Sequence, residues 1–223
     1  MTTVIVTSVL NPVDKPLDYS PIRSVYSPVE RVEQSINTIN SIRQHLGGVR
    51  IVFVDCSGEL PNEAYRVKDV LHGKDQFVDL SKDASVLASV VSANKSYGEL
   101  MLLDWTVSNL SFDGDIFKIS GRYYLDNDFD FGTLDKSADI NCKARGFAHA
   151  NNVCLTTFYR IRNRDIFMRY IAHGKILFRQ YPSISAEHVL FHFMSCNHDL
   201  KIHNLDRIGV VGQIAVSGET HYN

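Results

Sequence analysis

A cluster of polar residues follows an apolar stretch near the middle of the chain. Residues 115–125 read DIFKISGRYYL, and the apolar positions predict a short buried strand that runs into a polar turn. That turn is expected to carry Lys118, Ser120, Gly121 and Arg122. An arginine can bind a phosphate or carboxylate through two parallel hydrogen bonds, and a glycine lets a ligand approach the backbone closely. The pattern predicts an anion site, with a core strand whose basic residues meet nearby surface acids as the alternative.

The segments that precede this one predict the sheet that would position it. Continuous apolar runs at residues 4–6 and 51–54 are typical of strands covered on both faces. Between them, Ser27-Pro28-Val29-Glu30 predicts a helix start with a capping box, and apolar residues at helical spacing follow. A strand–helix–strand unit predicts a parallel pair with a right-handed crossover. The long irregular loop 11–26 is expected to be functional or mobile.

Polar residues at the ends of these elements are candidate ligand contacts. In open α/β sheets ligands bind at the carboxyl ends of the strands, where Thr7, Ser8 and Asp55 are expected. Asp55 would accept hydrogen bonds from a base or a ribose, or else cap the next turn. Arg31 opposes the dipole at a helix start, so it is there either for a ligand or for a surface salt bridge. Lys95 precedes another helix start, which is a suitable anion site.

The remaining elements are expected from periodicity and capping signals. Ser96 and Glu99 have the spacing of a second capping box, and Glu187 would lie in the first turn of a later helix. The glycine-punctuated segment 208–218 is expected to form a strand or a loop that closes over the site. Helices are also predicted at about 64–71, at 83–91, and from a cap at Asn163 to about Ala172, and strands at 76–80 and 153–159.

Composition and charge restrict the class of protein. The chain has 223 residues, is 44% hydrophobic and 22% charged, and carries a net charge of -2, which favours one soluble globular domain over a basic nucleic-acid-binding domain. The 4 cysteines form no C-x-x-C pair, which argues against a zinc cluster and for reduced thiols in a cytosol-like compartment. No apolar stretch is long enough for a transmembrane segment. A cytoplasmic protein is expected, with the basic region 160–170 as a solvated helix face or a peripheral membrane contact.

The order of these elements resembles a nucleotide-sugar glycosyltransferase with the GT-A fold, of the small single-domain kind found in bacterial polysaccharide clusters and in large DNA viruses. The resemblance spans nearly the whole chain and implies an α/β fold that is GT-A-like (Rossmann-like), with a mixed, mostly parallel sheet flanked by helices. It implies one domain over 1–223, with a nucleotide-binding half at about 1–125 and an acceptor-side half at about 126–223. The segments that carry it are Thr7-Ser8 with residues 26–43, Asp55-Cys56-Ser57, residues 94–99 with 117–123, and residues 183–187 with 212–218.

The resemblance also implies an activity, which is transfer of a sugar from a nucleoside-diphosphate sugar to a hydroxyl acceptor in polysaccharide or glycan biosynthesis. A UDP-sugar is the expected donor, and a hexosyltransferase-like, inverting reaction is the simplest chemistry with one candidate base. Glu187 would be that general base on the acceptor side. The other implied roles are contacts with the nucleotide-sugar, by Thr7, Ser8, Arg31, Asp55, Lys95, Gly98, Glu99, Lys118, Ser120, Gly121 and Arg122.

One departure from that family concerns the metal. Ser120-Gly121-Arg122 stands where most GT-A enzymes carry a metal-binding D-x-D. The developing charge on the leaving diphosphate must still be neutralised. Either Lys118 and Arg122 do this directly, or Mn²⁺ or Mg²⁺ binds elsewhere. The candidates for that are Asp126 and Asp128, and His221 near the C-terminus is a further contact for a metal or diphosphate.

Two other functions remain open. A nucleotidyltransferase would share the sheet and the nucleotide, but it normally has a glycine-rich basic loop after the first strand, where this chain reads TSVLNP at residues 7–12. A non-catalytic nucleotide- or sugar-binding module would bind the donor without turnover. The sequence argues against a Rossmann dehydrogenase, because no G-x-G-x-x-G follows the first strand.

Overall fold

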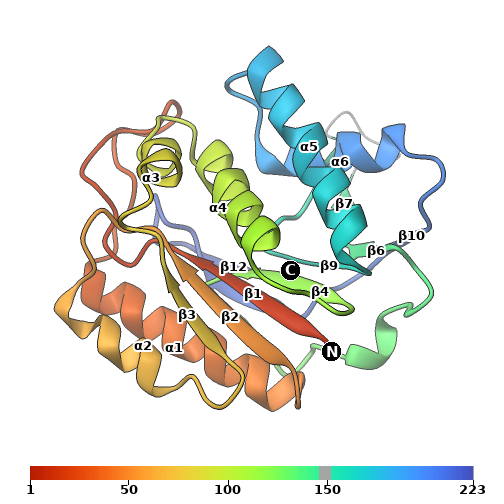
Figure 1. Cartoon of the computed structure of the whole chain (residues 1–223), viewed down its shortest axis with the longest axis horizontal. Coiled ribbons are helices and arrows are strands. Elements are labelled where there is room, and N and C mark those ends of the chain that lie inside the picture. Colours follow the sequence, from red (N-terminus) through yellow and green to blue (C-terminus); the bar gives the residue numbers. More distant parts are fainter. Residues whose placement is uncertain (146–151, 223) are drawn as a thin grey trace.

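The computed structural model describes residues 1–145 and 152–222, and a seven-stranded sheet forms its centre (Figure 1). The strand order is β10-β6-β9-β4-β1-β2-β3, in which β9 is antiparallel to both of its neighbours and the other pairs are parallel. The strands are β1 (Thr3–Ser8), β2 (Arg50–Asp55), β3 (Gln76–Asp79), β4 (Ile116–Ser120), β6 (Ile140–Cys142), β9 (Phe158–Ile161) and β10 (Ile202–Asn204). The predicted mixed, mostly parallel α/β fold is confirmed.

Helices cover both faces of this sheet, and alternate residues of each strand serve two separate cores. Val4 and Val6 pack with α1 (Pro28–His45) and α2 (Tyr65–Asp69), whereas Ile5 packs on the other face with the remaining helices. Those helices are α3 (Ala84–Val90), α4 (Lys95–Asn109), α5 (Arg164–Gln180) and α6 (Ala186–Cys196). Short 3-10 turns lie at η1 (Asn62–Ala64) and η2 (Phe131–Thr133). Burial on both faces explains the continuous apolar runs in the sequence.

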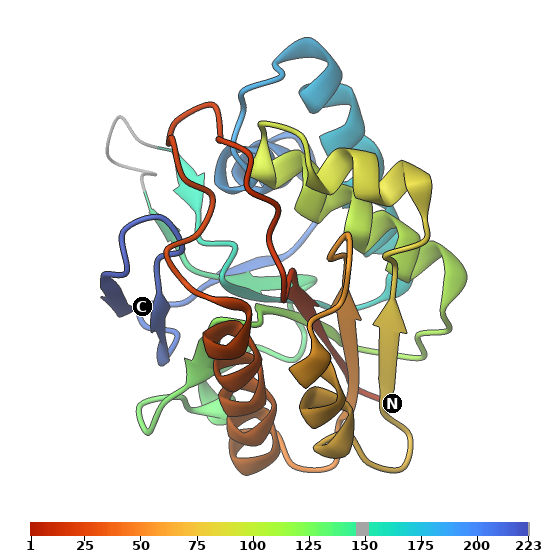
Figure 2. The same ribbon diagram turned by 90° about the vertical axis from the view of Figure 1, so that its left-hand side faces the viewer.

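The register of the parallel strands brings three strand ends to one edge of the sheet. Ser8 of β1 lies beside Asp55 of β2, and Thr7 lies beside Ser120 of β4. The loop after β1 rises from this edge and returns to the start of α1, as Figure 2 shows in red. The polar residues that follow each strand are therefore neighbours in space.

The two predicted capping boxes have different outcomes. Ser27 and Glu30 form the one at α1, with both reciprocal hydrogen bonds. The one at Ser96 and Glu99 is wrong, because Asn94 is the N-cap of α4 and its side chain accepts from the backbone N–H groups of Ser96 and Tyr97. The Asn94 amide also donates to the carbonyl oxygens of Pro182 and Ile184, which ties the start of α4 to the turn before α6. Glu99 is thereby free to point elsewhere.

A second, three-stranded sheet extends the turn after β4. Its order is β12-β11-β5, formed by β5 (Tyr123–Leu125), β11 (Val210–Gln213) and β12 (Thr220–Tyr222). The strand expected at 153–159 is instead β8 (Val153–Cys154), paired with β7 (Ala144–Arg145), and β9, separated by residues 155–157. The helix capped by Asn163 continues to Gln180 rather than Ala172.

The basic region 160–170 is taken up by contacts within the fold. Arg160 is buried and pairs with Asp115 at 2.6 Å, and Arg162 pairs with Asp139 at 2.9 Å. Arg164 donates to the carbonyl of Val107, and Arg169 makes a two-pronged contact with Asp199. These arginines therefore contact groups of the protein itself. Within residues 1–145 and 152–222, no helix is both long and apolar enough to cross a membrane.

The pairing of β5 with β11 requires a glycine at position 212. A Cβ there would lie 2.3 Å from the ring of Tyr123 and 2.6 Å from the carbonyl oxygen of Arg122. We expect Gly212→Ala to lower the free energy of unfolding by about 2 kcal/mol through overpacking. Urea denaturation checks this, with Gly47→Ala as the control because nothing lies within 4 Å of that position. Equal stabilities of the two variants would contradict it.

Candidate active site

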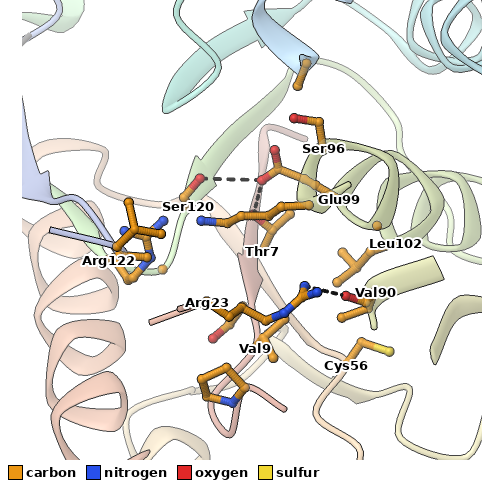
Figure 3. A pocket seen from close by; sticks show the side chains of 18 of the residues that line it. Thr7, Val9, Arg23, Cys56, Val90, Ser96, Glu99, Leu102, Ser120 and Arg122 are labelled. Atoms are coloured by element: carbon orange, nitrogen blue, oxygen red, sulfur yellow. Dashed lines mark hydrogen bonds between the residues drawn. The ribbon is translucent and has the colours of Figure 1, made fainter. Parts of the chain in front are cut away.

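A cavity of about 340 Å³ opens at the carboxyl ends of β1 and β4. Its walls come from segments far apart in the sequence, and Figure 3 shows their side chains pointing into one space. Thr7 and Ser8 come from β1, Arg31 from α1 and Arg122 from the β4–β5 turn, while the first turns of α4 and α6 face the same cavity. The loop 9–23 and residues 214–216 complete the wall. A ligand here would touch the end of the parallel sheet, as in other open α/β proteins.

Most of the residues singled out from the sequence meet in this cavity. Asp55 and Lys118 do not line it. The residues that do are Thr7, Ser8, Arg31, Lys95, Gly98, Glu99, Ser120, Gly121, Arg122 and Glu187.

Lys118 lies inside β4 rather than in the predicted turn. It is fully buried, with its Nζ 2.6 Å from Oε1 of Glu99, 2.6 Å from the carbonyl of Thr156 and 2.9 Å from Oγ of Ser120. All its charge-assisted contacts are therefore to the protein. The prediction that Lys118 belongs to the turn is wrong, because the β-strand continues through it to Ser120.

Asp55 is also fully buried and supports the loops around the site. Its carboxylate accepts hydrogen bonds from the backbone N–H of Leu10 at 2.7 Å and from that of Ser57 at 2.8 Å. These contacts match the turn-capping alternative and connect the loops after β1 and β2. Burial raises the pKa of Asp55, while the hydrogen bonds from Ser57 and Leu10 and the charge of Arg31 oppose that rise.

The two glycines of the candidate site allow close packing. A Cβ at Gly98 would lie 2.8 Å from Cα of Val90, so this glycine lets α4 approach α3. Gly121 donates its N–H to the carbonyl of Thr7 at 2.9 Å and lies against Ser35 of α1. Both glycines bring the walls of the cavity together.

Four cations in the wall, Arg23, Arg31, Lys95 and Arg122, form no ion pair among the described residues. Arg31 is buried and donates from Nε to the carbonyl of Val9 at 2.6 Å, and Arg122 donates to the carbonyl of Gln213. These carbonyls orient the guanidinium groups without neutralising them. The cavity therefore carries a local positive charge in a chain whose net charge is -2.

The pKa values of Lys95 and Arg31 are lowered in this positively charged wall. The pKa of Lys95 is held well below its usual value, first by burial and then by the positive charges of Arg122 and Arg31, against which Glu99 and Glu187 act. The pKa of Arg31 falls to about 9, again by burial first and then by the charge of Arg122. An anion bound between these groups would oppose both shifts.

Two carboxylates face the cations. Glu99 receives hydrogen bonds at Oε1 from Thr7 at 2.9 Å and Ser120 at 3.5 Å (Figure 3). These are in addition to its ion pair with Lys118. Burial alone would raise the pKa of Glu99, but Lys118, Thr7 and the charge of Lys95 together hold it below the usual value. Glu187 accepts from the Thr156 hydroxyl at 3.0 Å and lines the cavity from the first turn of α6.

The donor set does not fit a divalent cation. Mn²⁺ and Mg²⁺ prefer several oxygen ligands with carboxylates among them. Asp126 caps the backbone N–H of Asp128, Asp128 pairs with Arg207, and neither aspartate lines the cavity. His221, on β12, does not line it either. Among residues 1–145 and 152–222, no group of three or more His, Cys, Asp or Glu side chains is arranged to hold a metal.

The sequence predicts a functional or mobile loop after β1 but does not indicate which of its residues belong to the site. Tyr19 is 64% exposed at the cavity, and Arg23 lines it while donating to the carbonyl of Val90 at 2.9 Å (Figure 3). The length of the loop was the available signal, but length does not specify which side chains turn inward. Ile214, Ala215 and Val216 line the cavity as expected for the segment 208–218.

Removing Lys118 should leave the part-buried carboxylate of Glu99 without its cation. We expect Lys118→Met to lower the free energy of unfolding by about 3 kcal/mol, and Glu99→Gln in that background to restore most of the loss. Lys175→Met is the control, because the Lys175–Asp104 pair lies nearer the surface and exposed pairs contribute little. Denaturant titration of these three variants and of Glu99→Gln alone measures this. Additive losses in the double variant would contradict the coupling.

The charged Lys95 side chain is expected to lower the free energy of unfolding. Its folded-state pKa is lowered, so the native state binds this proton less readily than the unfolded chain, and stability rises with pH up to the unfolded value of about 10.4. Lys95→Met should therefore raise the free energy of unfolding at neutral pH, by on the order of 1 kcal/mol, and the gain should shrink as the pH approaches that value. Urea titrations at several pH values test this, with the exposed Lys82→Met as the control. A destabilised Lys95→Met protein at neutral pH would refute it.

No protein-family model and no curated protein sequence matches the chain. Several solved structures share its fold. Galactosyltransferase LgtC, in complex with donor and acceptor sugar analogues, aligns with a TM-score of 0.54 and 12% identity over 92% of this chain and 73% of its own. Core-mannan synthase A (CmsA/Ktr4) from Aspergillus fumigatus, in its Mn/GDP form, aligns with a TM-score of 0.60 and 9% identity over 94% and 73%.

The nucleoside-diphosphate-sugar pyrophosphorylase from Vibrio cholerae RC9 also aligns, with a TM-score of 0.52 and 9% identity over 95% of both chains. At sequence identities of 9 to 12%, these similarities establish a shared fold and not a shared activity. The chain has the GT-A fold of nucleotide-sugar glycosyltransferases.

Proposed function

We propose that this protein transfers a sugar from a nucleoside-diphosphate sugar, with a UDP-sugar as the expected donor, to a hydroxyl group of an acceptor. The observation that carries the proposal is the cavity at the carboxyl ends of β1 and β4, where unpaired cations face Glu187 across one space. Its volume of about 340 Å³ lies within the range of small-molecule sites. The similarity of the fold to those of LgtC and CmsA also supports sugar transfer.

The donor would lie along the edge of the sheet. Thr7, Ser8 and the exposed ring of Tyr19 lie on the side of β1 and its loop, where the nucleoside would bind. The diphosphate would lie against the cations. In this arrangement residues up to about 125 supply most of the donor contacts, and α6 approaches from the acceptor side. Asp55 acts through the loops it holds rather than by direct contact.

Glu187 would act as the general base of an inverting transfer. The Thr156 hydroxyl orients its Oε1. The acceptor O–H bond breaks as its proton passes to the Glu187 carboxylate, and the acceptor oxygen forms a bond to the anomeric carbon. The bond from that carbon to the diphosphate oxygen breaks, and its electron pair leaves with the nucleoside diphosphate. Positive groups near the departing oxygen stabilise the developing charge.

The fold of the Vibrio cholerae pyrophosphorylase keeps a nucleotidyltransferase as the second candidate. Such an enzyme transfers a nucleotidyl group from a nucleoside triphosphate to a sugar phosphate. A phosphate oxygen of the sugar phosphate forms a bond to the α-phosphorus, the bond from that phosphorus to the bridging oxygen breaks, and pyrophosphate leaves. A glycosyltransferase releases a nucleoside diphosphate instead. The segment after β1, which reads VLNPV at residues 9–13, lacks the glycine-rich basic loop expected for nucleotidyl transfer, and this favours the first candidate.

Glu187→Gln should lower turnover by about 100-fold or more while donor binding persists, because a general base contributes roughly 10²–10⁴-fold. The donor is first chosen by a thermal-shift screen of UDP-, GDP-, dTDP- and CDP-sugars, and release of nucleoside diphosphate is then followed with simple sugar acceptors. Glu63→Gln, on η1 and outside the cavity, is the matched control. Near-normal turnover by Glu187→Gln would remove Glu187 from the mechanism. Formation of nucleoside triphosphate and sugar 1-phosphate when pyrophosphate is added to the nucleoside-diphosphate sugar would favour the nucleotidyltransferase.

A further inference from the structure

We propose that Arg31, Lys95 and Arg122 bind the diphosphate of the donor directly, without a divalent cation. This inference rests on the proposed function and concerns the same cavity. It assigns to three side chains the charge neutralisation that a metal ion performs in enzymes with a D-x-D motif.

The first observation is that these cations are oriented but not neutralised. Arg31 uses Nε for the carbonyl of Val9 and Nη1 for the hydroxyl of Ser24, and Arg122 lies 5.6 Å from the ring centre of Tyr123 while donating to Gln213. The Lys95 side chain has neither hydrogen bond nor ion pair within the described part of the chain. Three cations held this close repel one another, so the site is complementary to a ligand with at least two negative charges.

The second observation is that the neighbouring carboxylates are already engaged. Oε1 of Glu99 contacts Thr7, Ser120 and Lys118, which leaves Glu99 and Lys118 as a neutral pair. Glu187 accepts a hydrogen bond from the Thr156 hydroxyl at 3.0 Å. A divalent cation at the β4–β5 turn would meet Arg122 where the family places a carboxylate, and it would be repelled by Lys95 and Arg31 as well.

The third observation is that the three cations are carried by elements that meet at the cavity. Arg122 follows Gly121, whose backbone lies against Thr7 of β1 and Ser35 of α1, so the guanidinium starts from the edge of the sheet itself. Lys95 is the first residue of α4, and Arg31 lies in the first turns of α1. Both helices therefore present their N-terminal ends to this space, and the positive ends of the helix dipoles add to the side-chain charges.

Isothermal titration of the wild-type protein with UDP, or with the nucleoside diphosphate selected by the screen, tests the inference. One arm contains EDTA and the other contains Mn²⁺. We expect binding in EDTA, with a dissociation constant within about twofold of that in Mn²⁺. In EDTA, Arg122→Gln and Lys95→Met should each weaken binding roughly tenfold or more, as expected when a charge-assisted hydrogen bond is lost.

The controls separate the possible failures. Lys82→Met, an exposed lysine, and Asp128→Asn, at the alternative metal position, should each leave the affinity unchanged in both arms. Binding that requires Mn²⁺ would overturn the inference and leave the proposed function standing. Absence of binding by every nucleoside diphosphate in both arms would overturn the proposed function and the inference together. Circular dichroism of each variant confirms that it is folded before titration.

Discussion

A buried ion pair between Glu99 and Lys118 joins α4 to the central strand beneath the cavity. The lysine is fully buried, so its charge is tolerated only because Glu99, Ser120 and the carbonyl of Thr156 surround it. The same contacts hold Glu99 against Thr7 at the end of β1. Strand β4, strand β1 and helix α4 are thereby fixed relative to one another at the edge where the ligand would bind.

Around this neutral pair, the cavity wall keeps charges that the fold leaves unpaired. Arg31 and Lys95 have lowered pKa values, primarily because burial disfavours their charged forms. A fold optimised for stability alone would replace or pair such groups, so their presence is typical of a site that trades stability for binding. Asn94 contributes by fixing two helix starts at once, since it caps α4 and holds the turn before α6. Lys95 on α4 and Glu187 on α6 are thus held in fixed relative positions.

The GT-A fold is shared with proteins that handle nucleotide-sugars in different ways, among them a galactosyltransferase and a nucleoside-diphosphate-sugar pyrophosphorylase. The chemistry therefore depends on which side chains stand at the strand ends rather than on the sheet. In this chain the turn after β4 presents Arg122 and no carboxylate. The proposed direct binding of a diphosphate depends on this positive charge at the edge of the sheet.

The amino-acid pattern was enough to predict the strands β1, β2 and β4 and the helix α1, because two-sided burial and capping leave local patterns of apolar runs and of Ser27 with Glu30. It also identified most of the cavity residues, since polar residues at the ends of parallel strands must meet at one edge. Three features could be seen only in the folded chain. Lys118 and Asp55 point inward to partners within the protein. Glu99 accepts from Thr7 rather than capping its own helix, and the loop with Tyr19 and Arg23 lines the cavity. The physical reason is that a side chain's partner depends on contacts between residues as distant as 7 and 99, which no local pattern encodes.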